Sequence, residues 1–271
     1  MVMAALPLRV LSRGMHLATE HSARATQWVE NALERYRFVE NFIAAEQMPY
    51  EVLYQSGILT VRKYLPVSES EIELGDGTMP VSAVSHAVPV VLIPPLAADP
   101  LNFDLLPNRS LVKFLCAHGY QVYLVDFGNP QHAPHLGLKD YAAGMLPEAL
   151  TAVRQNSNVQ DVTLLGYCMG GLFALIYAGW SGDKHIRNIV TIASPIDMKA
   201  AGPAAKLLQA MERPAALVRR FTKFRVHNIA PEKLAVPGWV SALIFKMTNP
   251  MGTVQGYLDL LMNMWDRKYV T

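Results

Sequence analysis

The chain has 271 residues, enough to bury one large core with an accessory segment beside it. Hydrophobic residues make up 51% of it, charged residues 17%, and the formal net charge is only +2, so nothing in the composition favours a nucleic-acid partner. No apolar run reaches the roughly 18 residues of a membrane-spanning helix. The two cysteines, Cys116 and Cys168, are too few for a disulfide framework.

Residues 1–48 predict a leader followed by an amphipathic helix. Within 19–46, apolar residues from Trp28 to Ile43 recur at helical spacing, with charged residues between them. We expect this helix to pack on the core, and an interface with a partner is the alternative. The first 18 residues contain two arginines and no acidic residue, which we interpret as a disordered leader rather than a transit peptide.

Residues 49–198 predict a core in which strands alternate with helices. Continuous apolar runs are typical of strands covered on both faces, and the alternation predicts a doubly wound, mainly parallel α/β sheet. The expected strands lie at 50–64 (two strands joined near Gly57), 89–93, 121–125, 162–165 and 189–193, with helices at 109–118, 138–155 and 171–177 and a turn at 75–77. Ligands bind such sheets at the carboxyl ends of the strands.

Residues 199–271 have a different character and predict an incomplete helical cap over the active site. No strand-like run follows Ala193. Basic residues recur between Arg213 and Arg225, with phenylalanines among them. This cluster is suited to an anionic group such as the phosphates of coenzyme A, and a solvated surface is the alternative.

The box Gly166-Tyr167-Cys168-Met169-Gly170 follows an apolar strand and precedes an apolar helix. This order predicts a nucleophile elbow, a sharp turn that lifts one side chain clear of the sheet edge. The flanking glycines are needed because a Cβ there would clash with the tight backbone. A thiolate is a strong nucleophile, and the start of a helix favours it. The alternative is a buried, inert cysteine in a glycine-rich helix start.

Two backbone N–H groups are expected to bind the oxygen of a carbonyl that Cys168 attacks. The N–H of Met169 is the first, because it follows the nucleophile at the start of the helix. The second would come from the loop after the strand at 89–93. Prolines at the start of this loop have no N–H, so Leu96 or Ala97 must supply it. A purely structural Pro-Pro loop is the alternative.

Several segments in the same order and spacing resemble the polyhydroxyalkanoate synthases, relatives of the α/β-hydrolases with a cysteine nucleophile. The resemblance covers 50–197 well and the predicted cap only loosely. The matching segments are 51–64, Pro94-Pro95, 108–112, 119–130, 166–171 and 194–197.

This resemblance implies an α/β-hydrolase-like fold and an acyltransferase. Cys168 would take an acyl group from a hydroxyacyl-coenzyme A thioester and pass it to a growing polyester. An acyl hydrolase, either a thioesterase or a polyester depolymerase, and a non-catalytic granule-associated binding protein are the alternatives. We expect no metal and no resident cofactor, since coenzyme A enters as part of the substrate. A homo-oligomer and attachment to a polyester granule surface stay open, and a reactive thiol points to the reducing cytoplasm.

The base that would take the proton from Cys168 is not evident. In α/β-hydrolases the acid and then the histidine follow the nucleophile in the chain. His185 lies in a charged turn expected at the other end of the sheet, and His227 with Asp197 has the right order but no strand before it. His132 and His135 precede the nucleophile. We therefore expect the last strands and the triad to be missing from this chain, with little turnover.

Overall fold

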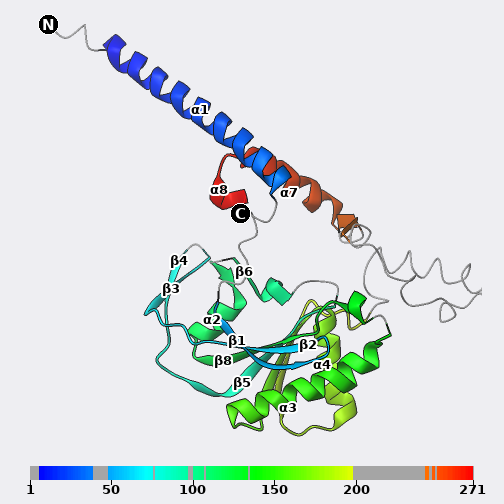
Figure 1. Cartoon of the computed structure of the whole chain (residues 1–271). Coiled ribbons are helices and arrows are strands. Elements are labelled where there is room, and N and C mark those ends of the chain that lie inside the picture. Colours follow the sequence, from blue (N-terminus) through cyan, green and yellow to red (C-terminus); the bar gives the residue numbers. More distant parts are fainter. Residues whose placement is uncertain are drawn as a thin grey trace, which may run out of the picture. The chain divides into compact units, whose positions relative to one another are not determined.

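The computed structural model (Figure 1) divides the chain into two compact units, Met1–Ala44 with Leu243–Thr271, and Ala45–Ala242. It describes residues 6–38, 48–75, 77–96, 100–106, 108–133, 135–197, 242–243, 246–247 and 249–270. Residues 198–241 are therefore not described. They include His227 and the basic cluster from Arg213 to Arg225.

A six-stranded sheet forms the centre of the larger unit (Figure 1), in the order β1-β2-β8-β5-β9-β10. Its strands are β1 (Tyr50–Ser56), β2 (Leu59–Tyr64), β8 (Tyr120–Asp126), β5 (His86–Ile93), β9 (Val162–Tyr167) and β10 (Ile186–Ile192). The four strands from β8 to β10 are parallel, whereas β2 pairs antiparallel with both β1 and β8. The predicted doubly wound, mainly parallel sheet is thus confirmed.

The order of the strands reverses at β5. The chain passes from β5 to its neighbour β8 on one side and then crosses to β9 on the other side. In open α/β sheets such a reversal marks the crevice where ligands bind, at the carboxyl ends of the strands. The loops that follow β5, β8 and β9 all begin at this edge.

Helices cover both faces of the sheet. On one face α2 (Leu111–Ala117) packs against β5 and β8 with buried Val112 and Cys116. On the other face lie α3 (Leu146–Ser157) and α4 (Met169–Ser181), which bury residues such as Leu150 and Phe173. Successive residues of a strand point to opposite faces of the sheet. Val91 therefore belongs to the core beneath α3 and α4, whereas Val90 and Leu92 belong to the core beneath α2.

Two predicted helices have different bounds from those expected. Residues 109–110 form the short strand β7 (Arg109–Ser110), paired with β6 (Asp104–Leu106), and Ser110 then caps α2 by accepting a hydrogen bond from the Lys113 N–H. The helix expected at 138–155 consists of a π-helical turn, η4 (Asp140–Met145), followed by α3. The predicted turn near Gly75 joins β3 (Glu71–Leu74) to β4 (Gly77–Pro80).

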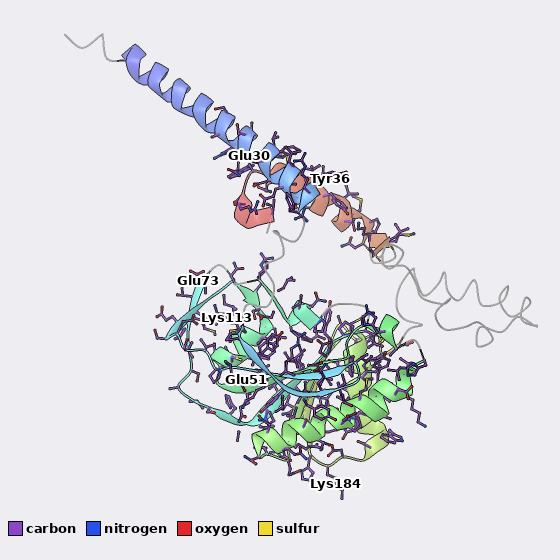
Figure 2. The ribbon with its side chains drawn as sticks, in the orientation of Figure 1. Glu30, Tyr36, Glu51, Glu73, Lys113 and Lys184 are labelled. Atoms are coloured by element: carbon purple, nitrogen blue, oxygen red, sulfur yellow. The ribbon has the colours of Figure 1, made fainter. Side chains whose placement is uncertain are left out.

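The smaller unit consists of α1 (Leu6–Arg37), α7 (Pro250–Met262) and α8 (Arg267–Val270). Side chains of α1 bind backbone carbonyls near the C-terminus: Trp28 Nε1 donates to Leu261 O at 2.7 Å, and the buried Asn31 amide donates to Met264 O at 2.7 Å. Glu30 and Tyr36 project from the same helix (Figure 2). The first helix begins at Leu6, so the prediction of a disordered leader up to residue 18 was wrong for most of that stretch. The good helix formers Leu, Met and Ala in this stretch favour a helix despite its lack of acidic residues.

The structure does not test the helical cap predicted at 199–271 as a unit. Residues 199–241 are outside the description, and α7 and α8 belong to the unit that contains α1. Among the residues that the structure describes, no helix combines the length and the apolar character needed to cross a bilayer.

Candidate functional site

Cys168 stands alone between strand β9 and helix α4, in the turn that the sequence predicts. Its backbone has φ 53° and ψ −120°, a conformation that side-chain-bearing residues rarely adopt and that costs roughly 1–3 kcal/mol. Two hydrogen bonds hold the turn: Cys168 N–H donates to Ile192 O at 2.8 Å, and Gly171 N–H donates to Cys168 O at 3.1 Å. The backbone is therefore bent and strained at the residue that would carry the reaction.

Three glycines allow the neighbouring segments to approach this turn. A Cβ on Gly166 would lie 2.4 Å from Cα of Gly171, and one on Gly170 would lie 1.9 Å from the carbonyl oxygen of Ile93. A Cβ on Gly171 would lie 1.9 Å from Oγ of Ser194. Contacts this short are impossible for a real Cβ, so Gly166 and Gly170, whose contacts are with backbone atoms, exclude any other residue without a shift of the backbone, and a side chain at Gly171 would require Ser194 to move.

The loop after β5 lies beside the first turn of α4, as the oxyanion prediction requires. The ideal Cβ of Gly170 would be 2.8 Å from the Pro94 carbonyl oxygen, which places the beginning of the loop against the helix. Leu96 and Met169 are both partly buried and pack against the same core. Ala97 lies outside the described residues. The roles of the Met169, Leu96 and Ala97 N–H groups in binding an oxyanion stay predictions.

The two thiols have different surroundings. Cys168 is half-buried at the start of the 13-residue helix α4, with the first backbone amides of the helix next to it. Cys116 is buried within α2, and this burial, together with the nearby Asp104 carboxylate, raises the pKa of its thiol to about 12. Cys116 is accordingly protonated at neutral pH, and only Cys168 has the exposure that a nucleophile needs.

Asp126, at the carboxyl end of β8, forms hydrogen bonds that stabilise the fold. Its Oδ2 accepts a 2.6 Å hydrogen bond from Arg62 of β2, and its Oδ1 accepts one of 2.8 Å from the Gly128 N–H. The Arg62 guanidinium also lies 4.7 Å from the centre of the Tyr50 ring. Both carboxylate oxygens are thus engaged in joining the antiparallel strands to the loop after β8.

Aromatic rings pack against α4, the helix that begins at the elbow. Phe173 of α4 packs edge-on against Phe127 at 5.6 Å and stacks on Tyr141 at 6.0 Å, and Phe127 meets Tyr141 edge-on at 5.5 Å. Such pairs add to the burial of their apolar area. They connect the loop after β8 and the π-helical turn to α4, and so stabilise the helix whose first residues form the site.

The structure places His185 at the opposite edge of the sheet from Cys168, and His227 lies outside the described residues. His185 occupies the turn between α4 and β10, at the amino end of that strand, where its Nδ1 lies 3.0 Å from Asp161 Oδ1. Its side chain is 54% exposed, as predicted. Figure 2 labels the adjacent Lys184 at the margin of the larger unit. His132 and His135 are exposed in the segment after β8, and Asp197 is exposed after β10.

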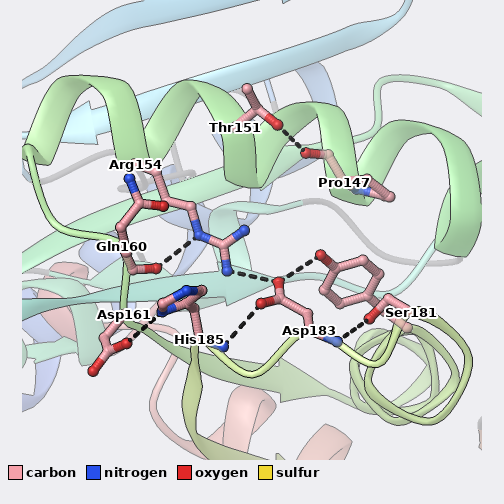
Figure 3. A network of polar contacts seen from close by, with 9 residues as sticks. Pro147, Thr151, Arg154, Gln160, Asp161, Ser181, Asp183 and His185 are labelled. Atoms are coloured by element: carbon pink, nitrogen blue, oxygen red, sulfur yellow. Dashed lines mark hydrogen bonds and ion pairs between the residues drawn. The ribbon is translucent and has the colours of Figure 1, made fainter.

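At this far edge the structure contains a polar network that the sequence did not reveal (Figure 3). Asp183 Oδ2 accepts hydrogen bonds from Arg154 at 2.6 Å and from the Tyr177 hydroxyl at 2.7 Å, while the His185 N–H donates to Asp183 Oδ1 at 2.9 Å. Burial alone would raise the pKa of Asp183, but these hydrogen bonds outweigh it and lower that pKa below its ordinary value. The network ties the ends of α3 and α4 to the start of β10.

A cavity of about 450 Å³ opens at the amino end of β8, among residues that include Lys63, Cys116 and Tyr120. Its lining does not include Cys168, so it is not the site of the elbow. Within the described ranges, His, Cys, Asp and Glu side chains form no group of three or more that could hold a metal ion.

Comparison with known proteins identifies the family. A family model described as "alpha/beta hydrolase fold" matches residues 88–232, more than half of the chain. The chain belongs to the α/β-hydrolase family. The matched region contains most of β5 and all of β8, β9 and β10, and therefore the elbow of this α/β-hydrolase and the strands that surround it.

This α/β-hydrolase is similar to several proteins named poly(3-hydroxyalkanoate) polymerase subunit PhaC. It is 30% identical to the one from Synechocystis sp. over 188 residues, which are 64% of this chain and 46% of that protein. It is 34% identical to the one from Thiocystis violacea over 136 residues (50% of this chain, 38% of that protein) and 39% identical to the one from Allochromatium vinosum over 116 residues (42% and 32%). The resemblance drawn from the motifs is confirmed, and the chain spans less than half the length of these relatives.

Proposed function

We propose that the chain provides the nucleophile of an acyltransferase of the polyhydroxyalkanoate synthase type. The observation that carries the proposal is a cysteine at φ 53° between β9 and α4, in a chain whose relatives are named as polyester polymerases. The strained turn presents the thiol at the switch-point edge of the sheet, where an extended acyl substrate has access.

The proposed chemistry has two transfers. The Cys168 thiolate attacks the carbonyl carbon of a hydroxyacyl-coenzyme A, the carbon–sulfur bond to coenzyme A breaks, and the coenzyme leaves as a thiol after taking a proton. The acyl group is then held on Cys168 as a thioester. The hydroxyl group at the end of a growing polyester attacks this thioester, which forms the new ester bond and returns the thiol.

Backbone N–H groups would stabilise the tetrahedral intermediates of both transfers. The N–H of Met169 begins α4, and the loop that contains Leu96 and Ala97 begins where Gly170 contacts Ile93 and Pro94. Two donors at such positions support the negative charge that develops on the carbonyl oxygen. Removing one such donor typically costs about a hundredfold or more in rate.

We propose that the base comes from outside the described residues. Among the described residues after Cys168 the one histidine is His185, which lies at the opposite edge of the sheet and is 54% exposed. His227 is the other histidine of the chain after the nucleophile. Without a base beside Cys168, the thiolate forms only by loss of its proton to water or buffer, and acylation is then slow.

Hydroxyacyl-coenzyme A and a polyester chain are the proposed partners, with a homo-oligomer or a polyester granule surface as further candidates. The two free thiols agree with a reducing compartment, for which we propose the cytoplasm. Membership of the α/β-hydrolase family also favours a second candidate, an acyl hydrolase, in which water rather than a polyester hydroxyl attacks the thioester.

Incubation with 3-hydroxybutyryl-coenzyme A tests the proposal. We expect the intact mass of the chain to increase by one hydroxybutyryl group on Cys168, with release of one equivalent of coenzyme A. A Cys168→Ala variant should lose both signals, whereas Cys116→Ser should keep them. Release of polymer supports the synthase, and release of free 3-hydroxybutyrate supports the hydrolase. A chain that gains no acyl group and releases no coenzyme A would contradict both.

A further inference from the structure

The end of strand β10 touches the elbow at two points. The carbonyl oxygen of Ile192, the last residue of the strand, accepts the 2.8 Å hydrogen bond from Cys168 N–H. Two residues later, Ser194 Oγ occupies the space in which a side chain on Gly171 would begin, and Ser194 Cβ is 3.0 Å from that position. One short segment therefore contacts both the nucleophile and the first turn of its helix.

Backbone strain is concentrated at this contact. Among the described residues other than glycine, three have a positive φ: Asn158 at 54°, Cys168 at 53° and Ala193 at 51°. Asparagine visits this region readily, and Asn158 caps the end of α3. Cysteine and alanine do so at a cost, and strained residues of this kind persist only where the surrounding structure holds them. Cys168 and Ala193 are joined through the Ile192 carbonyl.

The side chain of Ser194 is also in an energetically unfavourable environment. Its Oγ is buried and has no hydrogen-bond partner in the part of the chain that the structure describes. Burying an unpaired hydroxyl is unfavourable, so folding alone would favour alanine here. The following residue, Pro195, restricts Ser194 to an extended backbone, which holds its side chain over Gly171.

We propose that Ser194 is a positioning residue that keeps Cys168 in its strained conformation at the start of α4. The hydroxyl oxygen fills the space above Gly171 and prevents the first turn of the helix from moving toward β10. With the turn held, Cys168 keeps its positive φ and its place directly before the first residue of α4. The proposal rests on Cys168 being the nucleophile of the proposed function.

Removing the hydroxyl would release this restraint. A Ser194→Ala chain keeps Cβ but loses the oxygen nearest to Gly171, so the first turn has room to shift and Cys168 can relax toward a negative φ. The thiol would then leave the half-exposed position in which the strained turn holds it, and its reaction with an alkylating reagent would slow. The unpaired hydroxyl disappears at the same time, which favours the folded state. Reactivity and stability should therefore change in opposite directions.

The test is the rate of alkylation of Cys168 by iodoacetamide, followed between pH 5 and pH 10 by peptide mapping, together with the thermal midpoint of unfolding. For Ser194→Ala we expect alkylation to be at least about threefold slower across this pH range, because the thiol is no longer held in place, and the thermal midpoint to be unchanged or raised. Ser194→Gly, which also removes Cβ, should slow alkylation further. The matched control is Ser85→Ala, an exposed serine outside the elbow, which should change neither quantity.

The outcomes separate this proposal from the proposed function, because alkylation needs neither substrate nor base. If Cys168 of the unchanged chain reacts no faster than a free thiol, activation at the elbow is wrong and both proposals fail. If it reacts faster but Ser194→Ala is alkylated at the same rate as the unchanged chain, only the positioning role is overturned. The role is also overturned if the variant loses reactivity and stability together, as expected of a residue that merely supports the fold.

Discussion

Two glycines of helix α4 should respond in opposite ways to the same substitution. Gly170 lies in the first turn, where a Cβ would be 1.9 Å from Ile93 O, 2.7 Å from Ile93 C and 2.8 Å from Pro94 O. All three are backbone atoms of the sheet and its loop, so they cannot rotate away as a side chain could. Gly179 lies in the same helix with nothing within 4 Å of its ideal Cβ.

The magnitudes follow from these surroundings. Gly170→Ala forces β5 and α4 apart, and overpacking of this kind costs about 1–3 kcal/mol, with the upper end expected here because the contact is with backbone. Gly179→Ala replaces glycine in an exposed helix interior, which stabilises a helix by about 0.5–1 kcal/mol. The two variants should therefore differ by roughly 3–4 kcal/mol in the free energy of unfolding.

Urea denaturation followed by far-UV circular dichroism measures this difference. We expect the midpoint of the Gly170→Ala chain to fall well below that of the unchanged chain and the midpoint of Gly179→Ala to rise above it. Both variants add one methyl group to the same helix, so each is the control for the other. Equal shifts in the same direction would refute the close approach of β5 to the elbow.

Two further predictions concern titratable groups. Asp183→Asn should lower the free energy of unfolding by about 2 kcal/mol at pH 7, because it breaks an ion pair with Arg154 whose side chains are only 10% and 17% exposed. The folded-state pKa of Asp183 is lowered, so its contribution is complete above the ordinary carboxyl pKa and is lost as pH falls through the lowered value. Cys116, with a pKa of about 12, should resist iodoacetamide at pH 7 until the chain is unfolded, whereas Cys168 reacts in the native state.

Each of these has a direct measurement. Urea unfolding between pH 2 and pH 7 should show a weaker loss of stability in acid for Asp183→Asn than for the unchanged chain, and parallel curves would contradict the assigned pairing. Alkylation with and without urea, followed by peptide mapping, tests the cysteines. Native-state labelling of Cys116 as rapid as that of Cys168 would show that α2 does not exclude solvent as described.

The strands of the larger unit could be predicted because their residues are covered on both faces. Runs such as 89–93 and 121–125 are continuously apolar and became the centres of β5 and β8. The strand predicted at 189–193 has different bounds in the structure. It is β10, which covers Ile186–Ile192 and ends before Ala193, a residue with positive φ. Alternate residues of this strand, Val190 and Ile192, are 41% and 39% exposed, so the apolar pattern there was a weaker guide.

Helix boundaries were harder to predict because charge and spacing describe a helix but not where it begins. The lack of acidic residues before residue 19 predicts a disordered leader. The helix-forming residues of the same stretch instead continue α1 back to Leu6. In the same way, the sequence at 138–155 contains helical spacing throughout, yet the first turn closes as a π-helix before α3 begins. In this turn Tyr141 packs against Phe127 and Phe173, and the spacing within 138–155 does not contain these contacts.

The amino-acid sequence alone determined the elbow. A glycine box between an apolar strand and an apolar helix has few other solutions, because Gly166 approaches Gly170 and the adjacent Gly171 within this short stretch, where only glycine fits. The tertiary structure decided what surrounds it: which strand ends meet at Gly170 and Gly171, that Ser194 covers the first turn of α4, and that Arg154 pairs with Asp183 at the opposite edge. These contacts follow from the order of the strands, which long-range packing sets and local spacing does not contain.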